Sequence, residues 1–195
     1  MPSASRRGEA REGFVALAAA VCLFLSSIEY IIPRPLPFLR LGLANLPLLV
    51  ALDLLPAGQF FMLILLKALG QALIQGSLFS VSFLFSLTGT LASGLVMFAA
   101  RLLLGASLSL IGISILGALA SSLAQLSLAR LFIFGASAWL IAPPFLLVGL
   151  VTSTILGGLA QLYLQRSAWL PKIFPELKRR GTGGKRKVHR RRAAD

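Results

Sequence analysis

The chain has 195 residues, of which 57% are hydrophobic and 13% are charged. A soluble domain of this size needs a more polar surface, so the composition excludes that class and indicates a protein embedded in a membrane. The net charge of +13 reflects 19 Lys and Arg against 6 Asp and Glu, and most of these basic residues lie in the two terminal segments.

Those terminal segments are predicted to be cytoplasmic. Three basic residues precede Phe14 and eleven lie from Arg166 onward. Residues 1–13 are therefore interpreted as a basic N-terminus, and residues 166–195 as a basic, disordered tail. Such a tail can hold nucleic acid by counterion release, but we favour attraction to anionic lipid headgroups, and nucleic acid is not an expected partner.

Between the tails, residues 14–165 are predicted to form an all-α, six-helix membrane domain. The first apolar run follows three arginines, as in a signal peptide, but it is long and lacks a small-x-small exit, so we expect a retained helix. Pro143 and Pro144 are expected in the first turn of the last helix. Four runs approach the roughly 20 residues of a crossing: 14–32, 79–100, 107–129 and 145–164.

The remaining two helices, 41–55 and 60–74, are nearer 15 residues and are expected to be short or broken. They would form an antiparallel pair around the turn PAGQ. Because both termini are strongly basic, the positive-inside rule places both in the cytoplasm and requires an even number of crossings. The PAGQ turn and the Arg101 turn would then be inside, and the 32–40 loop outside.

With this topology, amide and charged residues gather in the outer half of the membrane domain. Such groups are costly at membrane depth and usually face a bundle interior or a watery cavity. We therefore predict an outward-facing substrate pocket lined by Glu29, Arg34, Arg40, Asn45, Gln71, Gln75, Gln125 and Arg130.

Most of these residues also have a structural alternative that the sequence leaves open. Glu29 can form a salt bridge with Arg34 or Arg40 that pins the loop, and we weigh this equally with ligand contact. For the glutamines, hydrogen bonds between helices are the more ordinary role. Arg130 can anchor a lipid headgroup or clamp an anionic substrate.

Two further pairs of residues are singled out by their spacing. Asp53 and Lys67 flank the PAGQ turn and are predicted to form a structural ion pair, with a proton or ion relay as the alternative. Ala16 and Ala20 form a small-xxx-small pair, a spacing that lets a second helix approach closely.

Several catalytic motifs are absent. The sequence has no Walker A loop, no DDxxD, no HExxH and no CxxC, and its only aspartates are Asp53 and Asp195. We therefore expect neither a metal nor a cofactor, and no nucleotide hydrolysis or Mg²⁺-dependent prenyl transfer by this chain alone.

Four segments within residues 15–164 carry a resemblance. They are IEYIIPRPLPFLRLGLANLPLLVALDLLP, KALGQALIQGSLFS, FLFSLTGTLASGLVM and GISILGALASSLAQLSLARLFIFGASAWLIAPPFL. They resemble the bacterial Gx transporter family, which is also labelled heptaprenyl diphosphate synthase component I. The basic tail lies outside the resemblance.

The resemblance implies a protein similar to the S components of energy-coupling factor (ECF) transporters, located in the bacterial cytoplasmic membrane. Such components have six helices, capture a vitamin-like molecule from outside and work with a T-type membrane subunit and ATPases. A small-residue face on the first helix commonly meets the T subunit, which assigns Ala16 and Ala20 to a partner interface.

The expected function is therefore that of a substrate-binding component for uptake of a small anionic or vitamin-like molecule. The alternative is a non-catalytic membrane subunit that associates with the catalytic subunit of a prenyl diphosphate synthase.

Overall fold

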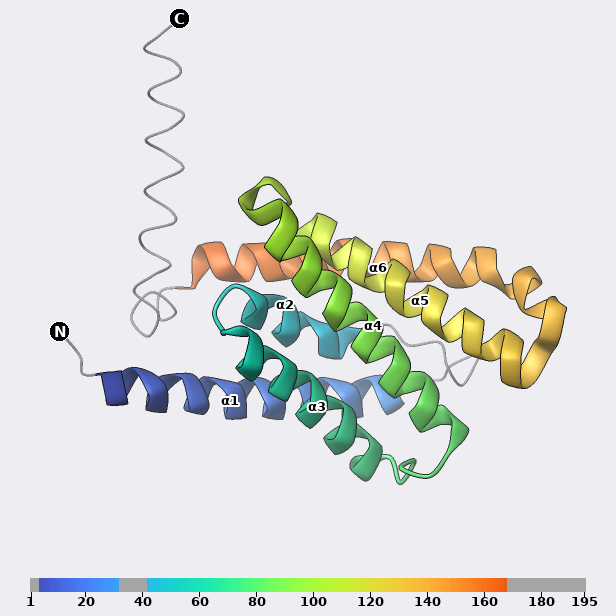
Figure 1. Ribbon diagram of the computed structural model, residues 1–195, viewed down its shortest axis with the longest axis horizontal. Helices are drawn as coiled ribbons and strands as arrows, with labels where there is room; N and C mark the ends of the chain where they lie inside the picture. Colours follow the sequence, from blue (N-terminus) through green and yellow to red (C-terminus); the bar gives the residue numbers. More distant parts are fainter. Residues whose placement is uncertain (1–3, 32–41, 168–195) are drawn as a thin grey trace, which may run out of the picture. The chain divides into compact units, whose positions relative to one another are not determined.

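The computed structural model describes residues 4–31 and 42–167, and all regular structure in these residues is helical. The long helices are α1 (Ala4–Ile31), α3 (Ala57–Ile74), α4 (Val81–Leu104), α5 (Leu110–Ala129) and α6 (Ala138–Arg166) (Figure 1). The short elements are η1 (Leu43–Asn45), α2 (Leu46–Leu52), η2 (Gly105–Ser107), η3 (Arg130–Phe134) and η4 (Gly135–Ser137).

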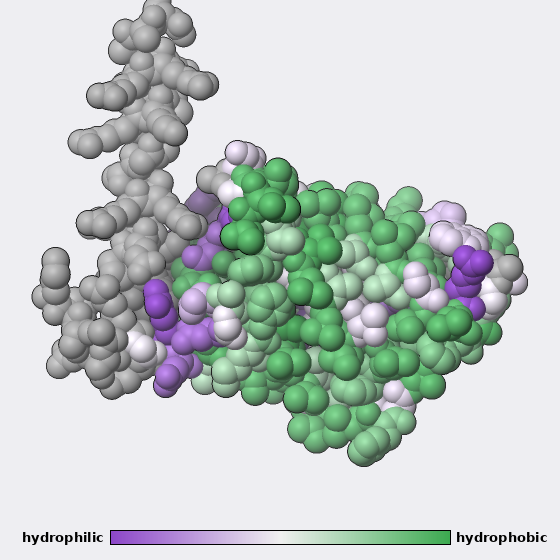
Figure 2. Space-filling view, in the orientation of Figure 1, coloured by the Kyte–Doolittle hydropathy of each residue, from purple (hydrophilic) through white to green (hydrophobic). Residues whose placement is uncertain are grey.

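Five segments of these described residues are long and apolar enough to cross a membrane: Arg11–Ile31, Ala57–Ile74, Val81–Leu104, Leu110–Phe134 and Ala142–Arg166. This confirms the predicted all-α membrane bundle and indicates a multi-pass membrane protein. Figure 2 shows apolar residues over most of the visible face of α3, α4 and α5, as expected for helices whose outer sides face lipid.

The chain divides into two compact units, Met1–Gln161 and Leu162–Asp195. In the second unit, the structure describes only the last turn of α6 and the residue after it, where the Ser167 N–H donates to the Tyr163 carbonyl at 2.9 Å. The helix packing and the cavity described below lie within the first unit.

The predicted helix 41–55 is shorter than expected. Together η1 and α2 run only from Leu43 to Leu52, about 15 Å at 1.5 Å per residue, which is half of the roughly 30 Å hydrocarbon core. Pro47 lies in the first turn of α2, and Pro56 disfavours a helical conformation at the residue before it. Of the six predicted crossings, the second in chain order is therefore a half-length helix.

Other helix boundaries also differ from the prediction, and the three largest differences are at the start of the first helix, the end of α5 and the start of the last helix. The first helix begins at Ala4, and α5 is extended through η3 to Phe134. The last helix begins at Ala138, so Pro143 and Pro144 lie inside it instead of in its first turn. The extra turn at the start of α6 is held by packing, because Ala142 and Phe145 join a buried cluster with Phe85 of α4 and with Leu126 and Ala129 of α5.

Small residues allow the helices of the first unit to approach one another closely. A Cβ atom added at Gly94 would lie 2.3 Å from Ile64 Cδ1, and one at Gly157 would lie 2.7 Å from the Ile111 Cα. These glycines therefore set the distances between α3 and α4 and between α5 and α6, as small residues commonly do in membrane bundles.

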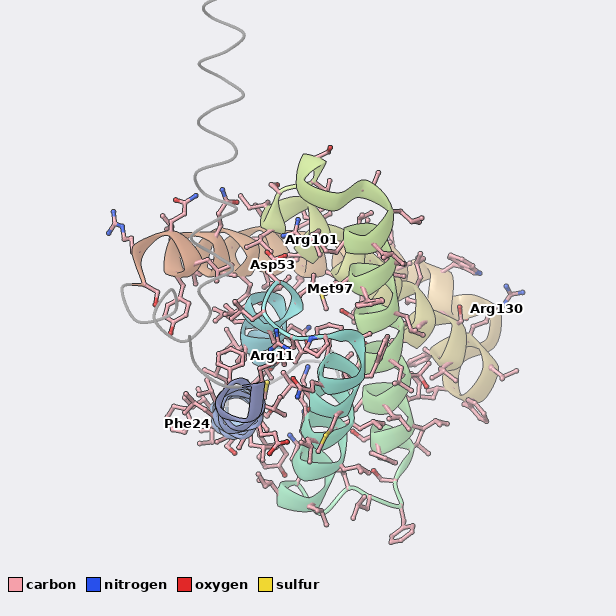
Figure 3. The ribbon with its side chains drawn as sticks, turned by 60° about the vertical axis from the view of Figure 1, so that its left-hand side comes forward. Arg11, Phe24, Asp53, Met97, Arg101 and Arg130 are labelled. Atoms are coloured by element: carbon pink, nitrogen blue, oxygen red, sulfur yellow. The ribbon has the colours of Figure 1, made fainter. Side chains whose placement is uncertain are left out.

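An ion pair ties two turns together at one end of the first unit. Arg101, near the end of α4, pairs with Asp53 at the end of α2 (Figure 3). The same guanidinium donates to the carbonyls of Gly105 and Leu108, at 2.9 and 3.2 Å. The PAGQ turn and the Arg101 turn therefore lie at the same end of the bundle, where α1 also begins (Figure 1).

Candidate functional site

A cavity of about 80 Å³ lies inside the first unit, between α1, η1, α2, α3, α4, α5 and α6. By the same measure one water molecule needs roughly 10–15 Å³. The cavity therefore has room for several waters or for part of a small ligand. Its polar residues come from segments far apart in the sequence.

Glu29 contributes a carboxylate from the last turn of α1. Its side chain is 4% exposed, and its Oε1 accepts a hydrogen bond of 2.8 Å from the Gly42 N–H. Gly42 has φ of +77°, a left-handed conformation that glycine adopts without strain. This conformation begins η1 and keeps the start of that turn against Glu29.

Lys67 contributes an ammonium group from the buried face of α3. Its side chain is also 4% exposed and donates a hydrogen bond to Asn45 Oδ1, at the end of η1. Gln71 lies one helical turn further along the same face and lines the cavity as well. Lys67 is seven residues before the end of α3, about 10 Å along the axis, so its charge lies well inside the bundle.

The remaining walls are rich in hydroxyl groups. On α4, Ser86, Thr90 and Ser93 follow an i, i+4, i+7 spacing, which places them on one face. The other lining hydroxyls are Ser114, Ser121 and Ser122 on α5 and Thr152 and Ser153 on α6. These hydroxyl groups were not among the site residues predicted from the sequence. Serine and threonine often bond to their own helix, so their presence in a helix does not by itself indicate a site. The i, i+4, i+7 spacing on α4 was the available signal.

Gln125 and Gly89 face each other across the cavity wall between α5 and α4. The Gln125 Nε2 donates to Ser121 Oγ at 3.4 Å. A Cβ atom at position 89 would lie 2.3 Å from that Nε2. Gly89 therefore makes room for the amide, and this supporting role was not predicted from the sequence.

Four of the eight predicted binding residues thus line one cavity: Glu29, Asn45, Gln71 and Gln125. Gln75 caps the end of α3, and Arg130 lies on a separate groove, so neither lines it. Arg34 and Arg40 lie outside the described residues.

The predicted Asp53–Lys67 pair is wrong in its partners. In the structure Asp53 pairs with Arg101, while Lys67 donates to Asn45. The physical reason is the face of the helix on which Lys67 lies. Lys67 and Gln71 are on the same side of α3 and line the cavity, whereas Asp53 lies at the end of α2, beside the turn after α4.

Ala16 and Ala20 are both exposed on α1.

The cavity combines one carboxylate, one ammonium, three amides and several hydroxyls inside an apolar bundle. Charged groups at membrane depth are costly unless they are paired or face a watery cavity. The arrangement offers both donors and acceptors, so it is chemically suited to hold a small polar molecule.

Comparison with known proteins gives one match. A family model described as heptaprenyl diphosphate synthase component I matches residues 18–163, which include every residue that lines the cavity. Searches of curated proteins and of solved structures find no match. The chain belongs to the heptaprenyl diphosphate synthase component I family.

Proposed function

We propose that this chain is the substrate-binding membrane component of an uptake system, and that it holds a small anionic or vitamin-like molecule in the cavity. The observation that carries this proposal is the convergence of Glu29, Asn45, Lys67, Gln71 and Gln125 on one cavity within a membrane bundle. The proposed entry is from the outer face, which follows from the positive charge of the termini.

A purely structural bundle has no need for this lining. Burying a carboxylate and an ammonium costs several kcal/mol per ion, roughly, before their interactions repay it. Apolar side chains of similar size would fill the space at lower cost. Polar side chains from several separate helices are therefore better explained by a ligand that they recognise together.

The substrate can be sought without knowing its identity. Full-length tagged protein would be purified from native membranes in mild detergent and denatured, and the released small molecules would be identified by mass spectrometry. We expect one compound in near-stoichiometric amount from the wild-type protein. Ala118→Leu, which adds bulk to the cavity wall, should release much less of it.

A matched control makes the same chemical change away from the cavity. Ala99 is exposed on α4 and does not line the cavity, so Ala99→Leu should retain the compound. Release of no compound from the wild-type protein, or equal release from both variants, would count against a ligand in the cavity.

The exposed side of α1 is the proposed contact with a T-type membrane subunit. Ala16 and Ala20 are exposed there beside the apolar Leu17 and Phe24, and Figure 3 shows Phe24 directed away from the other labelled residues. Small side chains on an apolar face allow close helix packing. The double variant Ala16→Leu/Ala20→Leu should lose the partner in affinity purification and keep the compound.

The name of the family favours a second candidate, a non-catalytic membrane subunit that associates with a prenyl diphosphate synthase. Affinity purification from native membranes distinguishes the two. Recovery of ATPases and a T-type membrane protein would support uptake, whereas recovery of a synthase catalytic subunit would support the second candidate.

A further inference from the structure

A second hollow, of about 600 Å³, lies where α5 passes into η3 and α6 begins. It shares no lining residue with the cavity. One wall, which we call the α5 wall, consists of Leu123, Leu126 and Ser127 of α5 and of Arg130, which follows α5 and begins η3. Trp139 contributes from α6. We call this hollow the Arg130 groove.

The α5 wall of the Arg130 groove has a polar end and an apolar length. Its four residues follow an i, i+3, i+4, i+7 spacing, which places them on one face of the helix. Arg130 lies at the end of α5, and Leu123 is two turns away, about 10 Å along the axis toward the middle of the span Leu110–Phe134. A guanidinium therefore lies at the polar end of this face, and the exposed side chain of Leu123 lies about two turns further into the span.

Arg130 itself is open to a ligand. Its side chain is exposed, and Figure 3 shows it directed away from the other labelled residues. Among residues 4–31 and 42–167, the structure records no hydrogen-bond or ion-pair partner for its guanidinium. Arg101, by contrast, is bound to a carboxylate and to two carbonyls.

The depth of the groove indicates what kind of ligand would meet this arginine. Arg130 lies four residues before the end of its span, and Trp139, which also lines the groove, is 59% exposed. Tryptophan and arginine at the end of a membrane span are typical of headgroup depth. The turn from Arg130 to Phe134 is a π-helix, a distortion that is frequent at functional sites.

We propose that the Arg130 groove binds an anionic phospholipid, with the phosphate on Arg130 and the first part of an acyl chain along the exposed side chain of Leu123. Arginine suits this role because its planar guanidinium can bind phosphate through two hydrogen bonds. A soluble anion would find one arginine and would gain nothing from the apolar walls. A lipid would contact both parts of the groove, because its acyl chain would pack on the apolar wall and its phosphate would provide a negative charge for Arg130.

Native mass spectrometry of the full-length protein tests this proposal. The protein would be titrated with phosphatidylglycerol and, separately, with neutral phosphatidylcholine, and the bound lipids would be counted. Arg130→Gln should lower phosphatidylglycerol retention about fivefold and phosphatidylcholine retention less, because the choline cation offsets the charge of the phosphate that both lipids carry. Ser127→Phe, which fills the groove from an exposed position on the same face, should lower retention of both lipids.

Arg166→Gln is the matched control, because Arg166 is also an exposed arginine at a helix end but does not line the groove. It should change phosphatidylglycerol retention less than twofold, roughly, if the groove and not charge alone selects the lipid. An equal loss in both arginine variants would leave only nonspecific lipid contact and would overturn the proposal. Displacement of the lipid by excess inorganic phosphate would also overturn it, because the site would then be one for soluble anions.

Discussion

Two regions of the first unit each place a carboxylate and a cation inside the bundle, and they use them differently. At the end formed by α2, α4 and the start of α5, Asp53 and Arg101 bind each other directly and tie two turns together. In the other region Glu29 and Lys67 line a cavity, and each has a hydrogen bond to η1 or to the residue before it. Charge serves packing in the first region, and in the second we propose that it serves to bind a ligand.

The largest expected effect is on the packing side of this comparison. Arg101→Gln removes the partner of a carboxylate that is only 12% exposed and the donor to two carbonyls. We expect a loss of about 3 kcal/mol in the free energy of unfolding, the lower end of the range for breaking a buried pair. Denaturation of the purified protein in detergent measures it.

The double variant Asp53→Asn/Arg101→Gln is the control for this first prediction. It leaves no uncompensated carboxylate, so it should be more stable than Arg101→Gln alone. Equal stability of the wild-type protein and Arg101→Gln would show that the ion pair does not hold the two turns together.

The second prediction compares a tightly packed contact between helices with the wall of the cavity. Gly157→Ala would place its Cβ 2.7 Å from the Ile111 Cα, and backbone atoms cannot move aside cheaply. We expect it to lower the free energy of unfolding by about 2 kcal/mol, as overpacking commonly does. Denaturation in detergent measures this change too.

The matched change at the cavity is Gly89→Ala. Its Cβ would lie 2.3 Å from Gln125 Nε2 and 2.8 Å from Ser121 Oγ, and both side chains can turn away, so we expect a smaller cost in stability than at Gly157. Retention of the bound compound should fall instead. If both glycine variants lost stability equally, the wall beside Gln125 would be ordinary packing and not an adaptable binding surface.

The sequence predicted the class of fold because long apolar runs leave little choice in a membrane. It also predicted that Glu29, Asn45, Gln71 and Gln125 would converge, because amides and carboxylates are costly on a lipid-facing surface. The side of the helix on which each residue lies was not used to choose the members of the site. The assignment of Arg130 to the cavity and the Asp53–Lys67 pair are errors of this kind.

Arg130 illustrates the error. It follows Gln125 by five residues, which is a rotation of about 140° around the helix, so the two side chains cannot line the same cavity. Helical position also explains Lys67. It lies four residues before Gln71, so the two side chains share a face of α3, and both line the cavity. Asp53 pairs with Arg101, which lies 48 residues away in the sequence. This contact depends on how α4 packs against α2, which the sequence pattern does not show.

The third prediction concerns the ligand side of the comparison. Lys67→Met keeps the apolar stem and removes the ammonium group that lies deep in the cavity. If the bound compound is anionic, its retention should fall about tenfold, the value of one hydrogen bond to a charged group. Isothermal titration with the compound recovered from the wild-type protein measures the change, and Arg166→Gln controls for the loss of one positive charge elsewhere.

The smallest expected effect decides the sign of the charge on the ligand. Glu29→Gln keeps a side-chain oxygen for the Gly42 N–H but removes the negative charge from the cavity. An anionic ligand would then bind about threefold more tightly, because a repulsive charge is gone, whereas a cationic ligand would bind more weakly by a similar factor. The two variants should therefore move affinity in opposite directions, weaker for Lys67→Met and tighter for Glu29→Gln. A loss of affinity in both would mean that the ligand contacts the carboxylate as well as the ammonium, as a zwitterion would, and the anionic assignment would have to be given up.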